Sequence, residues 1–278
     1  MSPLLLPFQF IRDARRVLRL PDARPDAWAH FRCWVSQRFA ASKDSAPVRA
    51  QLGDLVLHAH NHQELSFLFE EVFLRQDYKI NLPTGDPVII DCGANIGFAT
   101  VYLKQHYPAA RITCFEPNPS CFKLLQQHIT ENHLTNITAH QVACGNQNGE
   151  ISFFVSPGFS PLSSMFGSRS KDAQEIKVRL VKLSDYLTGP VDLFKLDVEG
   201  AEWGIFEDLI ASGKLALIQH MIIEYHHRIG GAKPELSRFL KLIEDAGFTY
   251  DIEAFISPLR KFSGAFQDVM IYASRPGK

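Results

Sequence analysis

A regular alternation of short apolar runs and amphipathic segments begins at Val88 and most narrows the folds open to this chain. Apolar runs of about four to eight residues are typical of buried strands, and apolar residues at every third or fourth position are typical of helices. The expected strands are 88–92, 111–116, 137–143, 191–198 and 215–225, and the expected helices are 97–107, 119–132, 202–211 and 234–246. The alternation predicts an α/β fold with a mostly parallel sheet covered by helices on both faces.

The end of the chain departs from this alternation. Strands are expected at 248–254 and 265–273, with no room for a helix between them, so they should pair antiparallel. Together with the five earlier strands they make a seven-stranded sheet with a terminal antiparallel pair. Strands at 150–155 and 178–183 are expected to form an inserted hairpin.

The first 80 residues have a different pattern. Amphipathic runs at 12–20, 26–41 and 64–77 predict a mainly helical extension, with a short strand within 52–60. The Pro- and Gly-containing segment 81–87 reads as a loop leading into the first regular strand. We therefore expect an extension over 1–80 and a main domain over 81–278, with the inserted hairpin near 150–183.

Charge and cysteine content exclude several classes of protein. Lys plus Arg number 29 and Asp plus Glu number 30, so the basic excess of most nucleic-acid binders is absent and a small-molecule substrate is favoured. The five cysteines form no CxxC pair, which argues against a zinc knuckle or a disulfide framework and favours the cytoplasm. No stretch reaches the roughly 18 apolar residues of a transmembrane segment.

Two strand ends carry the pattern of a cofactor site. Asp91 ends the first regular strand, and Gly93 and Gly97 flank the turn that follows. Glycines let backbone amides approach a ligand without obstruction by a Cβ atom. Glu116 ends the next strand, where a carboxylate can accept hydrogen bonds from both hydroxyls of a ribose. The spacing predicts an adenosine-containing cofactor.

An NAD-dependent oxidoreductase would use the same ribose contact and is the enzyme alternative. Its fingerprint requires GxGxxG, which Gly93-Ala-Asn-Ile-Gly97 lacks, and Asp91 would face a pyrophosphate unfavourably. An acidic strand end instead suits the cationic methionine part of S-adenosylmethionine.

Four segments resemble the FkbM family of methyltransferases. They are Val88-Ile-Ile-Asp-Cys-Gly-Ala-Asn-Ile-Gly97, Phe115-Glu-Pro-Asn118, Phe194-Lys-Leu-Asp-Val-Glu-Gly-Ala-Glu202 and Ile223-Glu-Tyr-His226. The resemblance extends over about 78–272. It implies a class I methyltransferase (Rossmann-like) fold and an O-methyltransferase that moves the methyl group of S-adenosylmethionine to a hydroxyl of a sugar or small natural product, leaving S-adenosylhomocysteine.

The resemblance also implies which residues hold the methyl donor. Asp91, Gly93 and Asn95 would line the methionine side, with Gly97 closing the same turn, and Glu116 would hold the ribose. The remaining expected donor contacts are Asn118, Val142 and Ala143 around the adenine, Tyr78 near the carboxylate, and Asp197.

The candidate catalytic residues follow two neighbouring strands. Lys195, Asp197 and Glu199 alternate at the end of one strand, and Glu224 and His226 end the next. Methyl transfer to an alcohol requires alignment of the acceptor oxygen and removal of its proton. Glu199 and His226 are the leading candidate bases, since a carboxylate or a near-neutral imidazole can accept that proton. Asp197 is expected to orient the donor or substrate.

Some expectations concern metals and partners. Asp197, Glu199 and Glu224 could supply oxygen ligands to a divalent metal, but no metal site is predicted. Residues 1–80 are expected to cap the acceptor or to form a dimer contact, which leaves a homodimer open. The alternative of another class is a non-catalytic S-adenosylmethionine-binding regulatory module.

Overall fold

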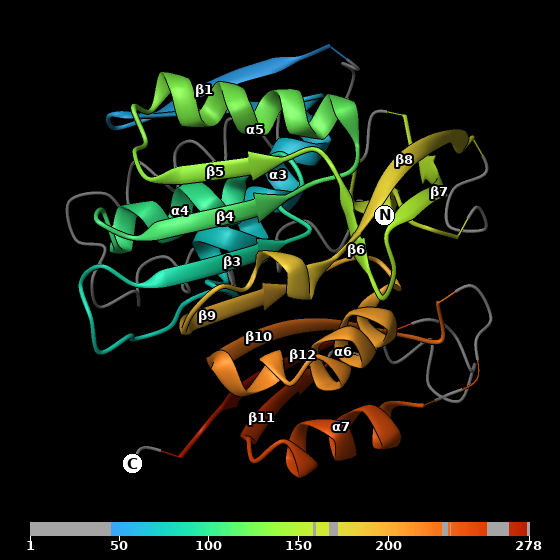
Figure 1. Cartoon of the computed structure of the whole chain (residues 1–278). Coiled ribbons are helices and arrows are strands. Elements are labelled where there is room, and N and C mark those ends of the chain that lie inside the picture. The colour runs from blue at the N-terminus through green and yellow to red at the C-terminus, as the bar shows by residue number, and fades with distance from the viewer. Residues whose placement is uncertain are drawn as a thin grey trace, which may run out of the picture.

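A seven-stranded sheet forms the centre of the computed structural model, which describes residues 46–157, 160–166, 172–229, 233, 235–254 and 267–276. The strand order is β11-β12-β10-β9-β3-β4-β5, visible from bottom to top in Figure 1. The strands are β3 Val88–Cys92, β4 Arg111–Phe115, β5 Ile137–His140, β9 Val191–Leu196, β10 Ile218–His227, β11 Thr249–Ala254 and β12 Gln267–Ser274. The helices expected at 12–20 and 26–41 lie outside the described residues.

Strand direction agrees with the sequence. β10, β9, β3, β4 and β5 pair in parallel, whereas β12 runs antiparallel to both β10 and β11. The mostly parallel sheet and the terminal antiparallel pair are therefore confirmed. Parallel strands present their carboxyl ends at one edge of the sheet, and the residues that follow β3, β4 and β9 meet there.

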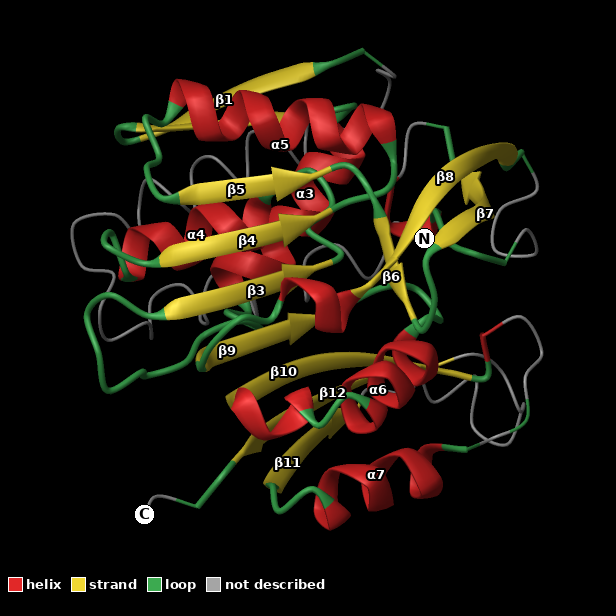
Figure 2. Ribbon diagram, in the orientation of Figure 1, coloured by secondary structure: helices red, strands yellow, loops and turns green. Residues whose placement is uncertain are grey.

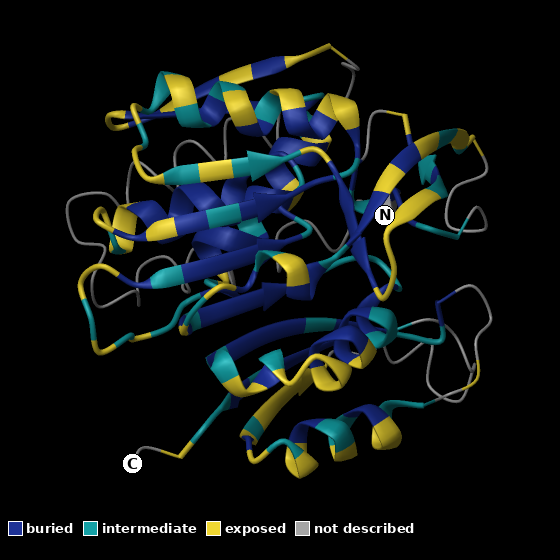
Figure 3. Ribbon diagram, in the orientation of Figure 1, coloured by how far each residue is buried: buried dark blue, intermediate teal, exposed yellow. Residues whose placement is uncertain are grey.

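Helices cover both faces of the sheet (Figure 2). Alternate strand residues belong to two hydrophobic clusters. Ile89 packs with the cluster that includes Val101, and Ile90 packs with the cluster that includes Phe206. One face carries α3 His62–Phe69, its π-helical continuation η1 Glu70–Leu74, α4 Phe98–His106 and α5 Pro119–Glu131. The other carries α6 Glu202–Ala211 and α7 Leu236–Asp245. Figure 3 shows the resulting buried central strands.

The expectation of one strand over 137–143 is wrong. β5 ends at His140, where a turn closed by Val142 N donating to His140 O (3.0 Å) redirects the chain. β6 Ala143–Gly145 then pairs in parallel with β8 Gln174–Lys182, which pairs antiparallel with β7 Gly149–Val155. This separate three-stranded sheet lies beyond the carboxyl ends of the central strands (Figure 1).

The described part of the extension packs on the central sheet. β1 Val48–Leu52 and β2 Leu55–Ala59 form an antiparallel hairpin, where the sequence predicted a single short strand. Leu57 and Phe69 belong to the same hydrophobic cluster as Ile112. His128 of α5 accepts a hydrogen bond from His58 N (2.7 Å) and contacts Ile96 O (2.6 Å), so it links the hairpin to the turn after β3. No helix in these described ranges is long and apolar enough to cross a membrane.

Candidate active site

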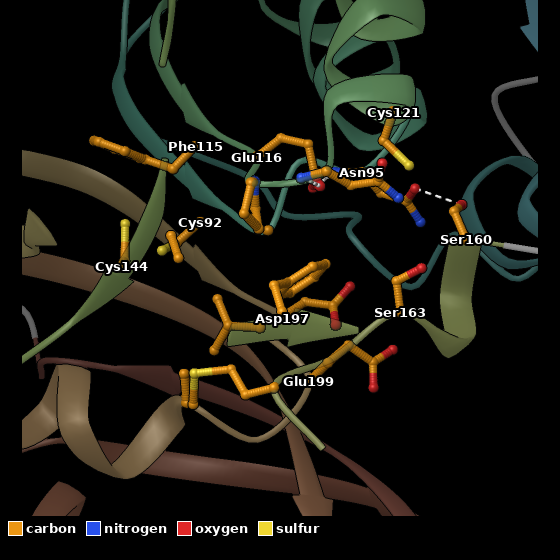
Figure 4. Close-up of a pocket in the computed structure, with 18 of the residues that line it drawn as sticks. Cys92, Asn95, Phe115, Glu116, Cys121, Cys144, Ser160, Ser163, Asp197 and Glu199 are labelled. Atoms are coloured by element: carbon orange, nitrogen blue, oxygen red, sulfur yellow. Dashed lines mark hydrogen bonds between the residues drawn. The ribbon is translucent and has the colours of Figure 1, made fainter. Parts of the chain in front are cut away.

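A cavity of about 610 Å³ opens at the carboxyl ends of β3, β4 and β9 (Figure 4). Predicted site residues that line it are Gly93, Asn95, Glu116, Asn118, Val142, Ala143, Asp197 and Glu199. The structure therefore brings together predicted donor contacts and one of the two candidate bases.

The turn after β3 depends on two glycines. Gly93 and Gly97 have φ of +84° and +96°, a region that residues with a Cβ atom rarely adopt. A Cβ on Gly93 would overlap the backbone carbonyl of Asp197, and a Cβ on Gly97 would lie 2.7 Å from Leu125 Cδ1. Gly93 thus allows the turn to lie against the end of β9. Gly97 lies outside the cavity and instead permits close packing of the start of α4 on α5.

Glu116 organises the opposite wall of the cavity. Its Oε2 accepts a hydrogen bond from Asn95 N, and its Oε1 accepts one from Asn118 N, both at 2.8 Å. Burial raises the pKa of Glu116 to about 7, although the two backbone donors oppose the shift. The carboxylate holds the turn after β3 beside the start of α5, and it lines the cavity where a ribose could bind.

Asp91 lies behind the turn rather than in the cavity, which departs from the expected contact with the donor. It is fully buried, its Oδ2 accepts from Thr100 Oγ1 (2.7 Å), and its Oδ1 lies 3.1 Å from Lys195 Nζ. Lys195 donates to Gly93 O (2.8 Å). Asp91 faces Lys195 instead of the cavity because the strand register pairs these two residues as neighbours on β3 and β9. Burial would lower the pKa of Lys195, but Asp91 and Asp197 outweigh it and raise that pKa.

A second cavity of about 280 Å³ lies on the other side of the same turn. The Tyr78 hydroxyl lies 3.3 Å from both Glu71 Oε1 and Asp197 Oδ2. Burial, together with Asp197, raises the pKa of Glu71 to about 8, so this side chain is mostly a neutral acid at pH 7. Sequence reasoning missed Glu71, because it lies in an amphipathic helical run without a recognisable motif. The predicted residues lining this cavity are Tyr78, Gly93, Asn95, Lys195 and Asp197.

His226 contacts three carboxylates that follow β9. Its Nδ1 lies 2.5 Å from Glu202 Oε1, and its Nε2 lies 3.0 Å from Glu199 Oε2 and 3.8 Å from Asp197 Oδ1. Strand alternation alone does not bring Glu199 here, since β9 ends at Leu196 and Glu199 has a φ of +54°. Asp197 and Glu199 line the main cavity, whereas the buried His226 supports them from behind.

The protonation state of His226 decides which of the two candidate bases, Glu199 or His226, can accept a proton. Burial lowers the pKa of His226, but the Glu202 carboxylate outweighs burial and the pKa rises to about 9. The imidazole is then cationic at neutral pH and both ring nitrogens are donors, so it cannot accept a proton. Desolvation, with Asp197, also raises the pKa of Glu224, which lines neither cavity. This arrangement favours Glu199 as the base.

We expect stability to depend on the charge of His226. Because its folded-state pKa of about 9 exceeds the ordinary 6.5, protonated His226 stabilises the fold at and below pH 6.5. That contribution is lost as pH rises through about 9. Urea denaturation from pH 6.5 to 9 should show the fall, and Glu202→Gln should flatten it by removing the main source of the raised pKa. Parallel curves for the two proteins would contradict this assignment.

The same side chains bear on metal binding. Ligand atoms of Asp197, Glu199 and His226 lie within 4.8 Å of one another, as do those of Glu224, His226 and Asp268. Both groups depend on His226, whose Nε2 would have to lose its proton before it could coordinate a cation. The prediction that no metal takes part stays a prediction.

The fold and the site define a class of enzyme. The strand order, the glycine turn after β3 and the acidic residue after β4 agree with the class I methyltransferase fold and the S-adenosylmethionine site that the sequence resemblance implies. The family model described as the methyltransferase FkbM domain matches residues 91–250, and the chain belongs to this family. The resemblance seen in the sequence is therefore confirmed.

The chain is also similar to individual proteins. The chain is 28% identical over 238 residues to methyltransferase sdnD of Sordaria araneosa, covering 73% of this chain and 90% of that protein. It is 30% identical over 156 residues to the 2-O-methyltransferase NoeI of Sinorhizobium fredii, covering 50% and 62%. The solved structure of methyltransferase FkbM from Methylobacillus flagellatus KT matches with a TM-score of 0.49 and 13% identity, over 90% of this chain and 60% of that one.

Proposed function

We propose that this methyltransferase transfers a methyl group to a hydroxyl of a sugar or small natural product. The observation that carries the proposal is that one cavity contains both Glu116, suited to a ribose, and Glu199, suited to accept the proton of an alcohol. The name of the relative NoeI, a 2-O-methyltransferase, supports a hydroxyl acceptor. The balanced overall charge supports a small acceptor rather than a nucleic acid.

The donor would lie across the two cavities. Val142 and Ala143 offer an apolar surface for the adenine, and Glu116 offers acceptors for the ribose hydroxyls. The methionine end would reach the second cavity past Asn95, where Tyr78 is the proposed contact. The Asp197 carboxylate borders both cavities and suits a cationic ligand. The residues therefore fit S-adenosylmethionine.

Glu199 would perform the acid–base step. S-adenosylmethionine supplies an electrophilic methyl group on a cationic sulfur. Glu199 accepts the hydroxyl proton as the acceptor oxygen forms its bond to the methyl carbon, and the electron pair of the broken carbon–sulfur bond stays on sulfur. His226, held cationic by Glu202, keeps Glu199 and Asp197 in place at 3.0 Å and 3.8 Å. Lys195 supports the turn through its bond to Gly93 O, and Glu224, which lines neither cavity, acts through its charge.

Residues 1–80 belong to this proposal as the part that caps the acceptor or contacts a second copy of the chain. Within its described portion, Glu64 contacts the loop that follows β7, since Glu64 Oε1 accepts from Ser160 N at 2.9 Å. Ser160 lines the cavity, so the extension reaches the site. A homodimer and a cytoplasmic location remain proposals of the same kind.

Ligand-induced stabilisation tests the donor. S-adenosylhomocysteine should raise the melting temperature and NAD should not, because a ligand bound to the folded state stabilises it. Glu116→Ala should abolish the shift, since the ribose contact and the support of Asn95 are lost. Glu199→Gln is the matched control, because it changes a carboxylate in the same cavity yet should keep the shift. Stabilisation by NAD alone would favour the oxidoreductase.

Transfer to a hydroxyl is tested with methyl-labelled S-adenosylmethionine and candidate acceptors taken from the products of neighbouring biosynthetic genes. Label should appear as a methyl ether of one hydroxyl, and Glu199→Gln should lose this turnover while still binding S-adenosylhomocysteine. Full activity of Glu199→Gln would contradict its role as the base. Donor binding without turnover on any acceptor would favour the non-catalytic module.

A further inference from the structure

Residues 160–166, which we call the acceptor wall, connect the two halves of the site. At one end, Ser160 Oγ donates to Asn95 Oδ1 (2.6 Å), the bond drawn in Figure 4. At the other end, the Phe166 ring packs so closely on Gly200 that a Cβ there would overlap it. Ser163, between these ends, lines the cavity. The wall thus contacts the turn after β3, which we call the donor turn, and Gly200, the residue next to Glu199.

Glu64 of α3 anchors this wall from outside the methyltransferase domain. Its Oε1 accepts a hydrogen bond from Ser160 N (2.9 Å), and its Oε2 accepts from His60 N (2.8 Å) and lies 2.8 Å from His60 Nδ1. The side chain of Glu64 is completely buried. A buried carboxylate is costly unless donors surround it, so these contacts should persist together.

Glu64 holds Ser160 as an ionised carboxylate. Burial would raise the pKa of Glu64, but His60 outweighs burial and holds the pKa below its ordinary value, while Glu64 raises the pKa of His60. Hydrogen bonds to an ionised carboxylate are shorter and stronger than those between neutral groups. Ser160 is therefore fixed through its backbone by Glu64 and through its hydroxyl by Asn95.

We propose that Glu64 is a positioning residue that holds the acceptor wall on the donor turn, so that donor binding and the shape of the acceptor side are coupled through Asn95 and Ser160. The inference rests on the proposed function, since it takes the cavity as the donor site. A donor that contacts Asn95 would favour the closed wall, and by reciprocity a closed wall would favour the donor. Release of the wall would expose the cavity to solvent.

Cys121 offers a readout that requires no knowledge of the acceptor. It lines the cavity, is 1% exposed, and lies beside Ser160, whereas Cys114 is fully buried and does not line the cavity. Alkylation of the full chain by iodoacetamide, followed residue by residue by mass spectrometry, measures opening at each thiol. Glu64→Asp keeps the charge that helps to raise the pKa of Cys121 but is one methylene too short for the bond to Ser160 N. It should therefore speed labelling of Cys121 relative to Cys114 by about tenfold, the effect of losing one charge-assisted hydrogen bond. Ser160→Ala, which loses only the bond to Asn95, should act in the same direction.

Glu131→Asp is the matched control, because Glu131 makes the same kind of contact with His58 (3.0 Å) away from the wall. Its ratio of Cys121 to Cys114 labelling should equal that of the unmodified protein. An unchanged ratio in Glu64→Asp, or a parallel rise at both thiols, would overturn the proposal. S-adenosylhomocysteine should protect Cys121 in the unmodified protein. Failure of that protection would contradict the donor site but not the role of Glu64, because that role is tested by the ratio of Cys121 to Cys114 labelling without ligand.

Discussion

Gly93→Ala is expected to weaken binding of S-adenosylhomocysteine by at least about 100-fold, the combined effect of backbone strain and a displaced turn. The added methyl would overlap the carbonyl oxygen of Asp197, and a backbone atom cannot move away by rotating a side chain. The turn after β3 or the end of β9 must therefore shift. Either shift separates Asn95 from Asp197, which border both cavities. Isothermal titration calorimetry measures the change.

Gly85→Ala provides the control for this change. Gly85 lies in the loop before β3, and no atom lies within 4 Å of the position that its Cβ would occupy. It should bind S-adenosylhomocysteine as the unmodified protein does. Normal binding by Gly93→Ala would show that the turn can move without loss of the donor site, and would remove the close approach to Asp197 from the account.

Asp91→Asn is expected to lower the free energy of unfolding by roughly 3–5 kcal/mol, the usual cost of breaking a buried ion pair. The change keeps the size of the side chain but removes the charge opposite Lys195, whose side chain is 3% exposed. Asp197, at 3.6 Å, offsets only part of that loss. Urea denaturation measures the effect.

The control is Asp86→Asn, an exposed carboxylate shortly before β3 that should have little effect on unfolding. The result decides between two roles for Asp91. An Asp91→Asn protein that unfolds at the normal urea concentration but does not bind S-adenosylhomocysteine would restore the direct donor contact that the sequence suggested.

The centre of the sheet was predictable because strands such as β3 and β9 are apolar runs and the helices have a regular apolar period. The error at β6 shows the limit of that reasoning. Residues 137–143 contain no Gly or Pro to mark a break, but the chain turns at His140, where Val142 N donates to His140 O. Apolar runs identify strands and do not tell which sheet they join.

The sequence predicts which strand ends carry the site residues, but it does not predict the direction in which each side chain points. Asp91 and Lys195 end neighbouring strands as expected, yet their shared register turns them toward each other and away from the cavity. Glu71 and Glu64 could not be identified from the sequence, because their functional contacts involve Asp197 and Ser160, far along the chain. Such contacts arise only when the helix is placed on the sheet.

The separate β6-β8-β7 sheet has a consequence for how this enzyme could diversify. The loop that carries the acceptor wall leaves from β7, whereas the turns beside Gly93 and Glu116 leave from the central sheet. Changes in the length or composition of the β7–β8 hairpin can therefore accumulate without disturbing the central strands, as long as Ser160 keeps its bonds to Asn95 and Glu64. Descendants of one ancestor could exchange acceptors while inheriting the same donor chemistry.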